Sequence, residues 1–133
     1  MTRLAKIALV FGLALPLLPV ATPQAEAQSA TCRGRVFIDT VYQTGLGGNR
    51  YEYFVQLRNG TASAVTAQLN LGGFGPTVTL FSPQLAGIQL APHASQTIRF
   101  GNGTNGQINN STVTRTYDTM PSGTATVAAN NCR

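Results

Sequence analysis

Two neighbouring segments of the chain alternate hydrophobic and polar residues one by one. In Tyr51–Asn59 the odd-numbered positions up to Leu57 are apolar or aromatic, and in Val65–Leu71 the odd-numbered positions are again apolar. A period of two places successive side chains on opposite faces of a β-strand. The sequence therefore predicts two strands, separated by the turn Asn59-Gly60-Thr61, whose odd-numbered side chains face a common core.

Turn-forming residues divide the following and preceding parts of the chain into further short segments of the same kind. No long segment spaces its apolar residues as an amphipathic helix does. We therefore predict an all-β domain, an antiparallel sandwich of roughly seven or eight strands. The further strands expected are Arg35–Gln43, Thr77–Phe81, Ile88–Ala91, Gln96–Phe100, Ser111–Asp118 and Thr124–Ala129. Ile98 and Phe100 are expected to point inward, and one face is expected to carry Val113, Arg115 and Tyr117. Turns are expected at 44–49, 71–76 and 92–95, and a hairpin closed by Thr119–Gly123.

Two stretches of this pattern resemble bacterial immunoglobulin-like domains. Val55–Thr61 precedes an alternating strand, as in those domains, where a strand ends in Asn-Gly or Asn-x-Thr. Leu90–Ile98 resembles their Leu-x-Pro-Gly-x-Ser turn and following strand, with His93 at the position of the glycine. The resemblance covers roughly Tyr51–Phe100 and implies an immunoglobulin-like β-sandwich. It implies no single activity, because such sandwiches serve adhesion, assembly, chaperoning and enzyme accessory roles.

The first 27 residues have the three parts of a secretory signal peptide. Arg3 and Lys6 precede an apolar run, Ile7–Val20, which is shorter than the roughly 20 residues that span a bilayer. A small-x-small motif then predicts cleavage between Ala27 and Gln28. We therefore expect residues 1–27 to be removed and 28–133 to form a single domain. That domain is expected in the periplasm or outside a bacterial cell, with no membrane span and no lipid anchor.

The two cysteines, Cys32 and Cys132, lie near the two ends of the mature chain. In an oxidising compartment such a pair is expected to form a disulfide, here joining the first strand to the last. Chain-entropy models assign about 4.7 kcal/mol to a closed loop of roughly 100 residues. Cysteines this far apart, in a chain with one histidine, make a poor metal site, so we expect no bound metal.

The mature chain is modestly basic, with arginine as its one basic residue type besides a single histidine. Residues 28–133 hold seven arginines, no lysine and three acidic residues, which gives a net charge of +4. This balance is typical of a soluble protein, and it also favours anionic partners such as lipopolysaccharide or acidic glycans. Nucleic acid is not expected as a partner, because the chain has no clustered basic run.

Groups that could perform catalysis are scarce. His93 lies in a predicted turn, and Asp39 and Glu52 are interpreted as surface charges beside arginines rather than as a glycosidase pair. Gly101–Gly106 fits the G-x-G-x-x-G motif, but no helical pattern follows it, so we predict a turn there rather than a dinucleotide site. We therefore expect neither an enzyme nor a cofactor. Three Asn-x-Ser/Thr sequons, at Asn59, Asn102 and Asn110, are expected to stay unmodified in a bacterium.

Strand parity predicts one outward surface on which aromatic residues and arginines gather. If the odd-numbered residues of Tyr51–Leu57 and the residue Phe100 face the core, the residues next to them in sequence point outward. In an immunoglobulin-like strand order, the strands that carry these residues share one sheet. Exposed aromatic residues beside arginines are typical of interaction surfaces. The predicted partner surface consists of Arg35, Phe37, Val41, Phe54, Arg58 and Arg99.

The last strand offers a second route to a partner. Thr124–Ala129 has no charge and no proline, so as an edge strand it could accept a strand of another chain. The leading hypothesis is an exported, non-enzymatic binding or structural module whose partner is a protein or an envelope polymer. The alternatives are a periplasmic chaperone or assembly factor for strand-forming clients and, third, an accessory subunit of an envelope enzyme.

Overall fold

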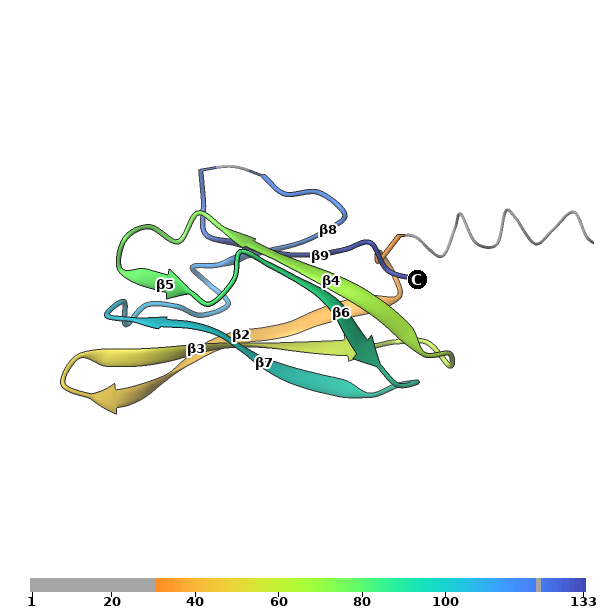
Figure 1. Cartoon of the computed structure of the whole chain (residues 1–133), viewed down its shortest axis with the longest axis horizontal. Coiled ribbons are helices and arrows are strands. Elements are labelled where there is room, and N and C mark those ends of the chain that lie inside the picture. The colour runs from red at the N-terminus through yellow and green to blue at the C-terminus, as the bar shows by residue number, and fades with distance from the viewer. Residues whose placement is uncertain (1–30, 122) are drawn as a thin grey trace, which may run out of the picture.

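The computed structural model describes residues 31–121 and 123–133, whose regular elements are all strands. These strands form two four-stranded sheets packed face to face, as Figure 1 shows. The predicted all-β sandwich is confirmed, whereas the predicted signal peptide with its cleavage point at Ala27 and Gln28 lies outside the described residues. The first sheet has the order β2 (Val36–Gly47), β3 (Arg50–Asn59), β7 (Ser95–Gly103), β5 (Val78–Leu80), and the second has β6 (Gln84–Leu90), β4 (Val65–Gly72), β9 (Thr126–Asn130), β8 (Thr114–Tyr117).

The core forms where the inward faces of the two sheets meet. Tyr53, Val55 and Leu57 of β3 are fully buried, and so is Leu69 of β4, which confirms the alternation seen in both segments. Although β3 and β4 are consecutive in sequence, they lie in opposite sheets, so their apolar faces bury each other. Complete burial of an aliphatic or aromatic side chain of this size contributes about 1.5–3 kcal/mol. Phe100 of β7 completes this layer, inward as expected.

The strands β2 and β3 form a hairpin that is longer than its sequence predicts. The predicted turn at 44–49 is too wide, because β2 continues to Gly47, which pairs with Arg50. The chain reverses through two residues with positive φ, Gly48 at 61° and Asn49 at 66°. This backbone is typical of the two-residue turns whose twist matches that of the strands, and glycine and asparagine tolerate it best.

A bulge in β2 changes the side on which later residues point. The register against β3 shifts between Ile38 and Thr40, so that Asp39 is an extra residue and the parity reverses beyond it. Val41, predicted to face outward, is therefore in the core with 1% of its surface exposed, and that prediction is wrong. Tyr42 takes the outward position instead, opposite Phe54 of β3.

The last two strands run parallel, so the predicted hairpin at Thr119–Gly123 is wrong. Thr114 pairs with Thr126 and Tyr117 with Ala129, so β9 begins beside the start of β8 and runs in the same direction. Because β8 is only four residues long, a short connection suffices for the return. As a consequence β9 lies between β4 and β8, so the hypothesis that the last strand could accept a strand of another chain as an open edge is wrong.

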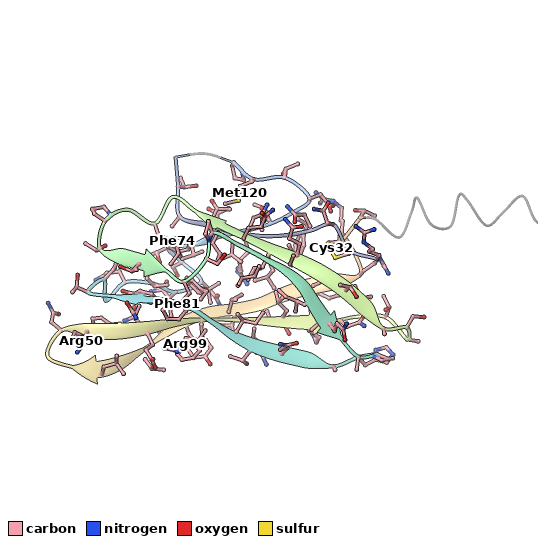
Figure 2. The ribbon with its side chains drawn as sticks, viewed as in Figure 1. Cys32, Arg50, Phe74, Phe81, Arg99 and Met120 are labelled. Atoms are coloured by element: carbon pink, nitrogen blue, oxygen red, sulfur yellow. A yellow bond between two sulfur atoms is a disulfide. The ribbon has the colours of Figure 1, made fainter. Side chains whose placement is uncertain are left out.

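Residues between β8 and β9 cover part of the outer face of the second sheet, over β9. Thr126 and Ala128 point away from the core, opposite in parity to Val127, yet both are fully buried. Met120 lies over this side, since a Cβ placed on Gly72 would be 3.0 Å from the Met120 Cε. Figure 2 shows Met120 on this side of the sandwich and Arg99 on the opposite side.

The predicted disulfide between Cys32 and Cys132 is confirmed, and it joins the segment before β2 to the segment after β9. It therefore links the two sheets at one end of the sandwich, where the two ends of the described chain lie side by side (Figure 1). Asp118, at the end of β8, accepts hydrogen bonds there from the Cys32 amide at 2.9 Å and the Thr31 hydroxyl at 2.8 Å. Burial raises the pKa of Asp118, but these hydrogen bonds outweigh burial and lower it overall.

The outer edge of β2 is closed by side chains from β8 and from the segment that leads into it. The Ile38 amide donates to the Tyr117 hydroxyl at 2.9 Å, and the Val41 amide donates to the Asn110 Oδ1 at 2.7 Å. The Arg115 guanidinium donates to the Ile38 carbonyl at 3.3 Å. These contacts occupy backbone groups that an incoming strand would need, so this long edge is protected against pairing. In the part of the chain described here, no helix is long and apolar enough to cross a membrane.

Candidate partner-binding face

The outer face of the first sheet gathers aromatic and charged side chains from β2, β3 and β7. The register places Phe37 opposite Arg58, Tyr42 opposite Phe54, and Phe54 opposite Arg99. Directly opposed side chains on one face lie close enough to interact. These residues and Phe81 form three ring contacts, which together cross the sheet from β2 to the residue that follows β5.

The first contact joins Phe37 to Arg58 near the start of β2. The Arg58 guanidinium carbon lies 4.5 Å from the centre of the Phe37 ring, and its Nε is 2.8 Å from the Asp39 carboxylate. The hydrogen bond with Asp39 raises the pKa of Arg58, so this guanidinium stays charged. Gly60 makes room for the ring, because a Cβ there would come within 2.4 Å of Phe37. The Asn59-Gly60-Thr61 turn thus helps to position the aromatic residue.

The second contact stacks Tyr42 against Phe54 in the middle of the sheet. Their ring centres are 5.1 Å apart and their planes differ by 14°. Aromatic pairs of this kind contribute about 0.5–1.5 kcal/mol beyond the area they bury. Both side chains are half-buried, so the pair is held in place while part of its surface stays open to a partner.

The third contact joins Arg99 of β7 to Phe81, which directly follows β5. The Arg99 guanidinium carbon lies 4.7 Å from the centre of the Phe81 ring, and its Nη1 is 2.6 Å from the Glu52 carboxylate. Phe81 leaves 48% of its surface exposed. Figure 2 labels Phe81 and Arg99, which lie close together on the side away from Met120.

We call the residues of these three contacts the aromatic–arginine face. The face is balanced in charge, because Asp39 and Glu52 each pair with one of its two arginines. Its rings and guanidinium groups hold one another, so little side-chain freedom is left to lose on binding. The face comprises Phe37, Asp39, Tyr42, Glu52, Phe54, Arg58, Phe81 and Arg99.

Most of the predicted partner surface is brought together here. Phe37, Phe54, Arg58 and Arg99 belong to the face, whereas Val41 is in the core. Arg35 lies just before β2, and its guanidinium donates to the Thr31 carbonyl at 3.5 Å.

Two members of the face, Tyr42 and Phe81, escaped prediction. Tyr42 points outward only because of the bulge at Asp39, which leaves no mark in the sequence. Phe81 lies outside any strand, and only its position after Thr77–Leu80 could have drawn attention to it.

A shallow pocket of about 160 Å³ lies at the end of the same sheet. It forms where the tip of the β2–β3 hairpin meets the end of β7, at the opposite end of the sandwich from the disulfide (Figure 2). Its lining residues include an exposed leucine, an arginine, an asparagine and a threonine. The lining residues are Leu46, Arg50, Tyr51, Asn102, Gly103 and Thr104.

The residues considered for catalysis lie apart from any such arrangement. His93 is exposed in the turn between β6 and β7, with φ at 57°, a backbone conformation that glycine adopts most readily. Asp39 and Glu52 each bind a different arginine. In residues 31–121 and 123–133, no group of three or more histidines, cysteines or acidic residues could hold a metal ion.

The G-x-G-x-x-G stretch is not the simple turn predicted from the sequence, because β7 continues to Gly103. A Cβ on Gly101 would lie 2.5 Å from the Thr79 carbonyl oxygen, and one on Gly103 would lie 2.1 Å from that of Thr77. These glycines therefore allow β5 to pair closely with β7.

Among the three sequons, Asn59 is fully buried. Its Nδ2 donates to the carbonyl groups of Ser63, Leu90 and Ala91. In the folded protein this amide nitrogen is occupied, so it cannot accept a glycan.

Comparisons of the chain with protein-family models, with curated protein sequences and with solved structures gave no significant match.

Proposed function

We propose that this chain is an exported, non-enzymatic binding module of the cell envelope or the extracellular space, and that its partner docks on the aromatic–arginine face. The observation that carries the proposal is the set of three ring contacts, which present half-exposed aromatic and arginine side chains on one sheet. Aromatic residues and arginine dominate binding energy at protein interfaces. Residues that are already ordered lose less entropy on association.

Export is supported by three features of the chain. The first 27 residues have the anatomy of a signal peptide, which predicts delivery out of the cytoplasm. The bond between Cys32 and Cys132 is of a kind that persists in oxidising compartments. The resemblance of residues 51–100 to bacterial immunoglobulin-like domains agrees with a binding or structural role outside the cytoplasm.

A strand-capping chaperone or assembly factor is the second candidate, and one observation favours it. β6 is an edge strand, and its sequence from Gln84 to Leu90 has no charged residue and no proline. Its register against β4 shifts between Ala67 and Leu69, which interrupts the edge. Because a bulge of this kind discourages pairing with another chain, we rank edge pairing below the sheet face.

The test is a crosslinking pull-down from the cells that make the protein, with envelope and medium fractions kept apart. We compare the native chain with the double variant Phe54→Ser and Arg58→Ser. The matched control is Thr66→Ser with Gln89→Ser, which shortens a facing pair on β4 and β6. Unfolding by denaturant checks that each variant folds. The proposal expects the first variant to lose the partner while the control retains it, and equal capture by both variants would overturn it.

A block on the β6 edge separates the two candidates. Thr66 exchanges both backbone hydrogen bonds with Arg133, so the facing Gln89 directs its amide away from β4. Gln89→Pro therefore removes an edge donor that the fold does not use. The sheet-face proposal expects unchanged capture of the partner by this variant. Loss of capture, together with suppression of client aggregation by the native chain only, would establish the chaperone instead.

A further inference from the structure

The pocket at the hairpin end holds an arginine whose charge no neighbouring side chain balances. The three acidic side chains in the described residues are all engaged elsewhere: Asp39 with Arg58, Glu52 with Arg99, and Asp118 with the segment around Cys32. Within residues 31–121 and 123–133, the Arg50 guanidinium makes neither an ion pair nor a side-chain hydrogen bond. It is an exposed cation at the mouth of a cavity.

We propose that this pocket binds a carboxylate-bearing sugar ring, such as a uronate residue of an acidic glycan, with Arg50 as the anchor for the carboxylate. The inference rests on the proposed function and deepens it, because it names an acidic polysaccharide as the envelope polymer that the module binds. The pocket extends the same sheet beyond the Glu52–Arg99 ion pair, since Glu52 faces Asn102 across the β3–β7 register. A polymer anchored here can continue over the aromatic–arginine face.

The dimensions of the pocket fit one ring. Sites for drug-sized ligands occupy about 300–1,000 Å³, so a cavity of about 160 Å³ accepts a single sugar residue rather than a larger ligand. Leu46 leaves 51% of its surface exposed and supplies apolar surface, against which the C–H groups of a sugar ring can pack. The cavity is open on one side, which suits one residue of a longer chain.

The polar groups match the substituents of an acidic sugar. Arg50 offers a planar guanidinium that can bind a carboxylate through two parallel hydrogen bonds. The Asn102 amide and the Thr104 hydroxyl both donate and accept, as sugar hydroxyl groups require. The neighbouring Glu52 carboxylate is held by Arg99 at 2.6 Å, so its repulsion of an anionic ligand is compensated.

The test uses trigalacturonate as the probe and its fully methyl-esterified form as the neutral match. Binding to the mature protein is followed by titration calorimetry and by amide chemical shifts. The variant is Arg50→Gln, and the control is Arg133→Gln, which removes the same charge at the end of the sandwich that holds the disulfide. A second variant, Thr104→Val, removes a hydroxyl of the pocket and leaves the net charge unchanged.

The proposal expects trigalacturonate to bind with shifts at the hairpin tip and the end of β7. Arg50→Gln should weaken binding about 10- to 100-fold, the range expected for a lost hydrogen bond to a charged group. Arg133→Gln should change the affinity less than about twofold, and the methyl ester should bind far more weakly than the acid. Absence of trigalacturonate binding, equal affinity for acid and ester, or an unaffected Arg50→Gln variant would each overturn it.

Inorganic sulfate separates a sugar site from a simple anion site. Millimolar sulfate should not displace trigalacturonate from the native chain, and displacement at that concentration would overturn the assignment of a sugar ring.

A failure of the sugar site can be distinguished from a failure of the proposed function. If Phe54→Ser with Arg58→Ser still captures the native partner while Arg50→Gln weakens uronate binding as expected, the aromatic–arginine face fails and the pocket stands.

Discussion

The two sheets share one core but differ on their outer faces. The first sheet presents three ring contacts and two compensated arginines, with Phe81 directly after β5 and the other residues on β2, β3 and β7. The second presents uncharged polar residues of β4, such as Thr66, Gln68 and Asn70, and its strand β9 is covered by the connection from β8. The chain thus covers part of one outer face with residues between β8 and β9 and leaves the other face open, which is why we assign the partner to the first sheet.

The largest expected effect comes from separating the two sheets at their shared end. Replacing Cys32 and Cys132 by serine frees the segment before β2 from the segment after β9. The loss in the free energy of unfolding should be about 2–5 kcal/mol, as for other small secreted domains. Denaturant unfolding of the double variant measures it. A loss below about 1 kcal/mol would show that packing alone holds the sheets together.

A single buried amide provides the next test of how the sheets are joined. Asn59 of β3 donates to the Leu90 carbonyl of β6 at 3.1 Å and accepts from the Thr61 amide at 2.8 Å. Asn59→Ala leaves these buried groups without partners and should cost about 3 kcal/mol. The control Asn70→Ala, on the outer face of the second sheet, should cost less than about 0.5 kcal/mol. Equal costs in thermal or denaturant unfolding would contradict this account of Asn59.

Introducing a leucine on the outer face of each sheet tests whether the second sheet is covered there and the first is open. Ala128 of β9 is fully buried although it points outward, whereas Thr97 of β7 points outward and is exposed. Ala128→Leu should force the β8–β9 connection away from the sheet and cost about 1–3 kcal/mol. Thr97→Leu should change stability by less than about 0.5 kcal/mol. If both variants are equally stable, the second sheet is not covered as described.

The smallest expected effect is a dependence on pH at the end of β8. The hydrogen bonds to Asp118 lower its folded pKa below the unfolded value of 3.8, so the carboxylate stabilises the fold above that pH. This contribution is lost as the pH falls through the folded pKa. Asp118→Asn should therefore lower stability at pH 7 and leave a smaller further loss on acidification. The comparison is made by unfolding both chains at pH 7 and at pH 3, and an unchanged slope would rule out a role for this carboxylate.

The sequence predicted the parts of the fold that depend on local alternation. Leu57 and Leu69 are buried because an unbroken period of two leaves one face apolar, and this signal needs no tertiary information. Val41 was misplaced because a single extra residue in β2 reverses the parity, and the sequence around Asp39 does not mark it.

The turn-rich segment 119–123 shows a second limit. Proline and glycine after β8 indicate that the strand ends, but they are equally compatible with an antiparallel hairpin and with a connection to a parallel strand. Whether β8 and β9 pair in antiparallel or in parallel fashion depends on which strands lie beside β9, and that is determined by the whole fold. The same limit applies to the site: Phe54 and Arg58 were found by parity, but Tyr42 and Phe81 require the register and the position of β5.

The measurement that tests the central claim most directly is hydroxyl-radical footprinting of the protein with and without its captured partner. The two outer faces carry their own reporters, because Tyr42, Phe54 and Phe81 lie on the first sheet and Met120 lies over the second. We expect the partner to slow oxidation of the three aromatic residues and to leave that of Met120 unchanged. Protection of Met120 with unprotected aromatic residues would contradict the assignment of the partner to the aromatic–arginine face.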